Sequence, residues 1–154
     1  MKFKLSLTLA GLLVAGAVFG AEDASVKIVK PHKAPRAAKG TGVQGTISFG
    51  ALPTQLQNLT CNDLSVHVGI LHSGAPALTS LASSRATGTI SSGQCSFHVN
   101  GRLPAGGPFD VVIVREQAQS ACRLSDSRSF GRVTLTRGVV SELNVQLTPV
   151  CEAD

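Results

Sequence analysis

Four cysteines have the most definite chemistry in this chain: Cys61, Cys95, Cys122 and Cys151. They are 34, 27 and 29 residues apart and include no C-x-x-C pair, which is poor spacing for a zinc site. Because the chain also begins like an exported protein, an even number of cysteines predicts two disulfides. Three connectivities are possible. We favour Cys95–Cys122 and Cys61–Cys151, because the second bond would join the segment after the first strand to the segment after the last.

Two histidines are the candidate metal ligands. His67 and His98 each alternate with apolar residues, so both are expected on the polar faces of strands, with Asp63, Asn100 and Asp110 as possible neighbours. They would form a two-histidine site only if their strands pair in the right register. Exposed strand histidines are far commoner than ligands, so we predict no metal and no cofactor. A small-ligand or metal carrier that uses these histidines is the alternative hypothesis.

The sequence contains no motif of a known catalytic centre. Nucleophilic catalysis needs a serine or cysteine beside a base, with donors for an oxyanion. None of the patterns G-x-S-x-G, S-x-x-K or H-E-x-x-H occurs. We therefore predict that the protein is not an enzyme, with a hydrolase or inhibitor whose site no motif reveals as a third hypothesis.

Stacking on exposed aromatic rings is also disfavoured. The chain has no Trp and no Tyr, and two of its six Phe lie in the first 20 residues. Phe130 is the one ring that we expect to be exposed. This argues against stacking-type sugar binding and against single-stranded nucleic acid. A cluster of arginines, interleaved with serines, is either an anion site or a solvated hairpin face, and we favour the solvated face. Its members are Arg123, Arg128, Arg132 and Arg137.

Residues 1–20 have the pattern of a secretory signal peptide. Lys2 and Lys4 precede an apolar run that extends to Phe19, and small residues suit cleavage after Gly20. The run is shorter than the roughly 20 residues of a membrane-spanning helix. We therefore expect a secreted or periplasmic protein whose mature chain has no stable membrane insertion.

Residues 21–39 carry five basic residues against two acidic ones, and all lysines of the chain lie at or before Lys39. This segment has too few apolar residues to offset the entropy of ordering, so we predict a flexible linker. Its charge would serve either solubility and spacing, which we favour, or contact with an anionic surface. From residue 40 onward seven Arg balance seven acids, so the remaining body is formally neutral.

Residues 40–154 show the two-residue period of half-buried strands. Val66, Val68 and Ile70 alternate with polar residues, as do Cys95, Phe97 and Val99, and further runs near 43–49, 133–135 and 143–147 do the same. We predict an all-β domain, a two-sheet antiparallel sandwich of about seven strands with an immunoglobulin-like or prealbumin-like fold.

The stretch 100–114, NGRLPAGGPFDVVIV, combines a turn with the most continuously apolar run of the domain. Residues 109–114 should form a central strand with neighbours on both sides. Pro104, Gly106 and Gly107 suit a chain reversal, so we predict a hairpin connection before this strand. Residues 73–93 are rich in Gly and Ser and are expected to form a mobile loop beside an open sheet edge.

The pattern of residues 92–114 resembles the turn, strand and "LPAG" turn of carboxypeptidase-regulatory-like domains, relatives of collagen-adhesin B-type repeats and of other prealbumin-like sandwiches. The resemblance covers residues 40–149 in outline. It implies an accessory, spacer or adhesive module. The chain departs from the family in lacking an Asp-Gly turn, and the absence of Lys after position 39 precludes within the domain the Lys–Asn crosslink of the adhesin repeats.

These features lead to one functional hypothesis. We expect an exported, non-enzymatic β-sandwich module that acts as a binding, adhesive or spacer domain in the cell envelope or outside the cell. Its partner would be a protein or a component of the envelope. Nucleic acid is excluded as a partner because the arginines are dispersed and balanced by acidic residues.

Overall fold

The fold is built from strands, as the two-residue period predicts. The computed structural model describes residues 26–31, 39–75, 77–100, 103–116, 122–125 and 128–151. The longer strands are β2 (Gly42–Phe49), β3 (Leu64–Leu71), β4 (Ala77–Arg85), β6 (Gln94–Asn100), β7 (Gly106–Arg115) and β9 (Gly131–Leu135). The shorter ones are β1 (Lys27–Val29), β5 (Thr87–Thr89), β8 (Cys122–Arg123), β10 (Val140–Glu142), β11 (Val145–Leu147) and β12 (Val150–Cys151). Three 3₁₀ turns complete the described elements: η1 (Thr54–Leu56), η2 (Cys61–Asp63) and η3 (Ile90–Ser92).

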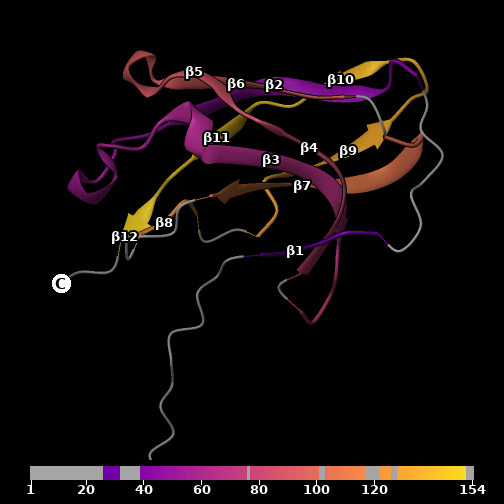
Figure 1. Ribbon diagram of the computed structural model, residues 1–154, viewed down its shortest axis with the longest axis horizontal. Coiled ribbons are helices and arrows are strands. Elements are labelled where there is room, and N and C mark those ends of the chain that lie inside the picture. Colours follow the sequence, from indigo (N-terminus) through magenta and orange to yellow (C-terminus); the bar gives the residue numbers. More distant parts are fainter. Residues whose placement is uncertain are drawn as a thin grey trace, which may run out of the picture.

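The strands form two layers (Figure 1). Sheet A has the order β1-β4-β3-β7-β9, and sheet B has the order β10-β2-β6-β5, with β11 also paired to β2. A small third sheet joins β8 to β12. The prediction of an all-β sandwich is confirmed, but its details are wrong in two respects. The described part contains twelve strands rather than about seven, and the sheets are mixed, because β1 runs parallel to β4 while β10 and β11 run parallel to β2.

The core lies between the inner faces of the two sheets. Val43 and Ile47 of β2 and Val66 and Val68 of β3 are all 0% exposed, and Phe97 of β6 is nearly so. Each of these side chains contributes about 1.5–3 kcal/mol when it is fully removed from water. The residues between them in sequence face outward, so the same alternation that builds the core also decides which side chains reach each outer surface.

The stretch before β7 is a crossing between sheets. Because β6 belongs to sheet B and β7 to sheet A, the predicted hairpin is wrong. Gly107 adopts a φ of +124°, and a Cβ there would lie 2.9 Å from the carbonyl oxygen of Val133, so the residue must be glycine. Leu103 is fully buried at this crossing. The predicted central strand is confirmed, since β7 lies between β3 and β9.

Two segments predicted to be mobile are partly strands. Lys27–Val29, within the proposed linker, forms β1 and pairs with Ala77–Thr79 of β4. Val26 then packs on the outer face of sheet A against Leu78 and Val112, in a small apolar cluster that composition alone did not reveal. The proposed loop at 73–93 contains β4 and β5, whose Ser- and Thr-rich sequence hides their pairing with β3 and β6. Residues 21–25 and 32–38 lie outside the described residues.

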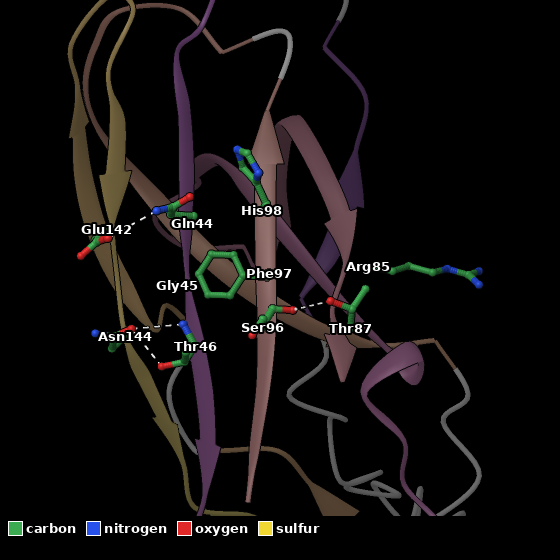
Figure 2. A pocket seen from close by; sticks show the side chains of 10 residues that line it. All are labelled: Gln44, Gly45, Thr46, Arg85, Thr87, Ser96, Phe97, His98, Glu142 and Asn144. Carbon is green, nitrogen blue, oxygen red and sulfur yellow. Dashed lines mark hydrogen bonds between the residues drawn. The ribbon is translucent and has the colours of Figure 1, made fainter. Parts of the chain in front are cut away.

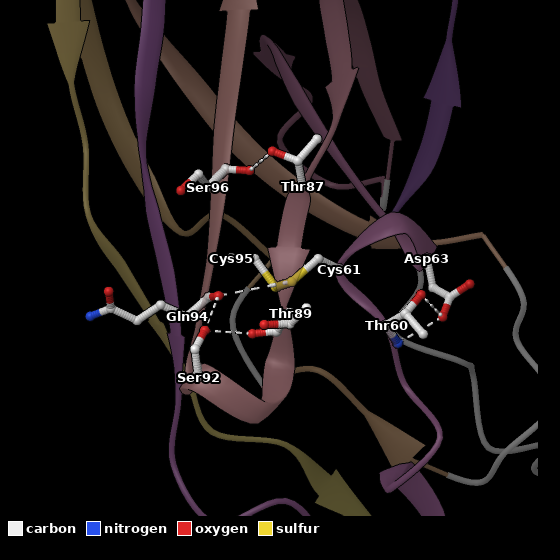
Figure 3. Close-up of a disulfide and its surroundings, with 9 residues drawn as sticks. All are labelled: Thr60, Cys61, Asp63, Thr87, Thr89, Ser92, Gln94, Cys95 and Ser96. Atoms are coloured by element: carbon white, nitrogen blue, oxygen red, sulfur yellow. Dashed lines mark hydrogen bonds between the residues drawn. A yellow bond between two sulfur atoms is a disulfide. The ribbon is translucent and has the colours of Figure 1, made fainter.

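The protein has two disulfides, as predicted, but the favoured pairing of Cys95 with Cys122 and of Cys61 with Cys151 is wrong. The bonds are Cys61–Cys95 and Cys122–Cys151. Cys61 lies in η2, which packs beside β5, and Gly88 of β5 is paired with Cys95 of β6 (Figure 3). Cys122 and Cys151 are directly opposite each other on β8 and β12. The first bond therefore links the segment before β3 to sheet B. The second links β12 to β8, in the segment that follows β7.

Peptide mapping of the non-reduced protein should recover Cys61 linked to Cys95 and Cys122 linked to Cys151. Removing either bond with a double Cys→Ala variant should lower the free energy of unfolding by roughly 3–4 kcal/mol, because each bond closes a loop of about 30 residues in the unfolded chain. Urea unfolding measures this loss. A fragment that joins Cys61 to Cys122 or Cys151 would contradict the pairing.

Candidate functional site

The two histidines are not brought together. His67 is on the outer face of β3 in sheet A, whereas His98 is on the outer face of β6 in sheet B, so the core of the sandwich separates them. The carboxylate of Asp110 already forms an ion pair with Arg132 at 3.2 Å and accepts a hydrogen bond from the hydroxyl of Ser129 at 3.0 Å. In the described ranges, no group of three or more His, Cys, Asp or Glu side chains is placed to hold a metal ion.

His67 has a serine neighbour but lacks the arrangement of a catalytic triad. Its Nδ1 lies 3.0 Å from Ser80 Oγ. Glu116, the nearby carboxylate, accepts hydrogen bonds from Ser65 and Arg85, both at 2.6 Å. No described hydrogen bond joins that carboxylate to the imidazole, so it does not orient His67 as a general base. Burial lowers the pKa of His67 below its ordinary value of 6.5, and the charge of Glu116 opposes this shift.

The predicted arginine cluster is divided among several elements. Arg132, on β9, forms an ion pair with Asp110 of the neighbouring strand. Arg123 belongs to β8, and Arg137 lies in the turn between β9 and β10. Phe130, the ring expected to be exposed, is partly buried against the main core. The arginines therefore lie on separate elements, and Phe130 is not the exposed ring that was expected.

Sheet B has an outer face made of hydrogen-bonding side chains in three rows, of which Figure 2 shows the first two. The rows follow from the strand registers, in which Gln44 pairs with Glu142 and His98, Thr46 with Ser96, and Ser48 with Gln146 and Gln94. We call this set the polar face. Its rows are Glu142–Gln44–His98, Asn144–Thr46–Ser96–Thr87 and Gln146–Ser48–Gln94–Thr89.

A shallow hollow of about 530 Å³ crosses the first two rows of the polar face. It extends from Glu142 and Asn144, beside β2, to Thr87 and Arg85 on the far side of β6. Gly45 and Phe97 also line it, although Phe97 is only 4% exposed and belongs to the core. The side chains of Ser96 and His98 have no hydrogen-bond partner among the described residues, so they are free to bind a ligand.

A break in the last strands shapes this hollow. Between β10 and β11 the chain leaves its regular pairing with β2, and the carbonyl of Leu143 lies directly against Gly45. Asn144 replaces the missing backbone partner, since its Oδ1 accepts hydrogen bonds from the backbone N–H and the hydroxyl of Thr46, at 3.1 and 2.9 Å. A side chain at position 45 would have no room, so glycine is required here.

The polar face carries almost no charge. Glu142 is the one carboxylate in the three rows, and the rows contain no Lys or Arg. Arg85, at the rim, is ion-paired with Glu116 at 2.6 Å. Amides, hydroxyls and an imidazole supply both donors and acceptors, so the face can exchange several hydrogen bonds with an uncharged polar ligand.

A second hollow of about 510 Å³ lies beside the Cys61–Cys95 bond, between the segment leading to η2 and β5. Its lining is more apolar and includes Leu52, Leu59 and Ile90. Asp63 caps η2 by accepting hydrogen bonds from the backbone and the hydroxyl of Thr60, both at 2.8 Å, and these bonds lower the pKa of Asp63. These bonds hold η2 in shape, and none of them points to a ligand.

The expected open edge is present in part. β5 is the end strand of sheet B, and beyond Thr79 no described strand pairs with the outer side of β4. The hydroxyl of Ser84, in this unpaired half of β4, is buried without a hydrogen-bond partner in the described part of the chain. The edge is interrupted at Ala86, where the chain passes from sheet A to sheet B and is fully buried. A partner strand could pair only with two short segments here, one in each sheet. The polar face is a larger continuous surface than this edge.

The comparisons identify no relative: no protein-family model, no curated protein and no solved structure matches the chain. None of the described residues forms a helix long and apolar enough to cross a membrane. The alternation predicts outward-facing positions in the runs 95–99 and 143–147, His98 among them, but not that they lie side by side. Sequence reasoning missed Thr87 and Thr89, whose signal was only a Thr-Gly-Thr alternation inside a segment that resembled a loop.

Replacing Gly45 by Ala should destabilise the protein by about 1–3 kcal/mol, because the new methyl group would collide with the Leu143 carbonyl. Urea unfolding measures the loss. Gly50→Ala is the matched control, since the nearest atom to its Cβ would be the Leu147 carbonyl oxygen at 4.0 Å. Equal stability of the two variants would show that the strand break does not press on Gly45.

Stability should depend on pH through His67. Because its pKa is lower in the folded protein, the unfolded chain binds the proton first as the pH falls below 6.5. The free energy of unfolding should therefore decrease below that pH and level off once folded His67 is also protonated. His67→Asn should remove this part of the decrease. Urea unfolding of both proteins between pH 7.5 and 5 measures it, and identical pH profiles would contradict the assignment.

Proposed function

We propose that the chain is an exported, non-enzymatic binding module of the cell envelope or the extracellular space, and that it engages its ligand through the polar face of sheet B. The N-terminal signal pattern and the two disulfides support export. The resemblance to carboxypeptidase-regulatory-like domains stays a prediction, and the proposal does not depend on it.

One observation supports this proposal above the others: the two outer faces of the sandwich differ. On sheet A, Leu78 and Val112 are covered in a cluster with Val26. The polar groups there form pairs, since Ser65 donates a hydrogen bond to Glu116 and Arg132 donates one to Asp110. On sheet B the polar side chains form continuous rows, and several of them have no partner among the described residues. Six of the eleven side chains bond within sheet B, and five have no described partner: Thr89, Gln94, Ser96, His98 and Gln146. These five donors and acceptors, held on a paired sheet, are available to a ligand.

The carrier hypothesis has less support. It requires His67 and His98 to converge, and they lie on opposite sheets. The hydrolase hypothesis requires an oriented base and a pocket around the nucleophile. Ser80 does contact His67, but the acid beside them bonds Ser65 and Arg85 instead. We therefore assign binding, and not catalysis, to the module.

The basic N-terminal segment has a supporting role in this proposal. Lys27 is exposed on β1 and Lys30 follows it, while Val26 is buried against sheet A. Residues 26–31 of this segment are thus attached to sheet A, opposite the polar face. It would add attraction to an anionic surface without occupying the polar face.

The double variant Ser96→Lys/Gln94→Lys should lose at least tenfold in retention on the envelope fraction of the producing cells. Both side chains are exposed and face outward from β6, so two lysines would place charge and bulk across the rows while the fold is preserved. The matched control is Thr134→Lys/Gln57→Lys, which adds the same charge at exposed positions outside the polar face. Equal retention of the two double variants would refute the proposed site.

A further inference from the structure

Resting on the proposed function, we infer that the ligand of the polar face is an uncharged polysaccharide, bound as an extended chain along the hollow that crosses β10, β2, β6 and β5. The inference rests on one observation: amide and hydroxyl side chains from four paired strands are aligned in rows.

Charge complementarity excludes the charged polymers. A nucleic acid or an acidic polysaccharide is held mainly by Lys and Arg, and the three rows contain neither. Among the described residues one cation, Arg85, lines the hollow at its rim, and its guanidinium is paired with Glu116. A polycation would find a single carboxylate, Glu142, which accepts a hydrogen bond from Gln44. An uncharged ligand is the class that this surface accepts without unpaired charge.

The chemistry of the rows also differs from that of a protein-binding surface. Protein interfaces depend on aromatic and aliphatic anchors that fill pockets at their centre. The rows contain no Phe, Tyr, Trp or aliphatic side chain, their one ring is the polar imidazole of His98, and Phe97 below them is almost completely buried. The ligand must therefore gain its affinity from hydrogen bonds, for which a polyhydroxylated chain is suited.

The geometry matches a chain molecule. Adjacent strands are about 4.8 Å apart, so side chains along one row recur at a spacing close to the length of one pyranose unit. Successive rows are about 6.7 Å apart along the strands, far enough for a sugar chain to lie over one row while its substituents reach the next. The hollow runs across the strands, from Glu142 to Thr87, in the direction of the rows.

This inference also accounts for the missing aromatic residues. Sugar-binding modules that stack on Trp or Tyr gain much of their affinity from one or two rings, and this chain has neither residue. A hydrogen-bonding face gives weaker binding at each sugar, because each bond replaces one to water. Affinity then grows with the number of sugars that contact the rows, so long chains are preferred over monosaccharides.

The test uses the purified mature protein, labelled with ¹⁵N, and three hexasaccharides as probes. Cellohexaose and chitohexaose are uncharged, and hexagalacturonic acid is an anionic control of equal length. At least one uncharged hexamer should shift the amide resonances of the polar face, among them Gln44, Thr46, Ser96 and His98. Its apparent Kd should rise at least tenfold in Ser96→Lys/Gln94→Lys and remain unchanged in Thr134→Lys/Gln57→Lys.

Three results would overturn the inference: no shift with either uncharged hexamer, shifts confined to other surfaces, or equal binding of hexagalacturonic acid. If the face variant still loses its retention on the envelope fraction while no uncharged hexamer binds, the ligand class is wrong and the proposed binding face stands. If retention is unaffected as well, both fail.

Discussion

The interaction on which the outer surface of sheet B depends is the contact between β2 and the broken strand β10–β11. Leu143 places its carbonyl against Gly45, and Asn144 then bonds Thr46 twice through its side chain. With this contact, β2 is paired on both sides, antiparallel to β6 and parallel to β10 and β11. If β2 were displaced by one residue, Gln44, Thr46 and Ser48 would turn into the core and the rows would disappear.

The register between β2 and β6 determines both which side chains are buried in the core and which ones form the polar face. Val43 and Ile47 are fully buried because Gln44 and Thr46 face outward, and Cys95 and Phe97 alternate with Ser96 in the same way. The Cys61–Cys95 bond fixes β6 from the inner side, so it holds the partner strand of β2 without occupying the outer face. Stability and the candidate binding surface are thus supplied by opposite sides of the same strands.

Much of the fold could be predicted from the sequence, because alternation and the number of cysteines are local signals. The all-β class, the central position of β7 and the presence of two disulfides all follow from such signals. What could not be predicted depends on which strands become neighbours. The pairing of Cys122 with Cys151 arises from two short strands with no pattern of their own, and β1 is a strand because Val26 and Ile28 pack against Leu78 in the folded protein. The polar face was visible only as separate outward residues, since its rows require the registers among five strands.

Chemical labelling of the histidines tests the central claim most directly. Diethyl pyrocarbonate modifies accessible imidazoles, and two of the histidines that the structure describes are exposed: His98 on the polar face and His72 outside it, after β3. The protein is labelled free and when bound to envelope material, and both sites are quantified by mass spectrometry. The account predicts that labelling of His98 falls several-fold on binding while that of His72 is unchanged. Undiminished labelling of His98 in the bound protein would show that the ligand sits elsewhere.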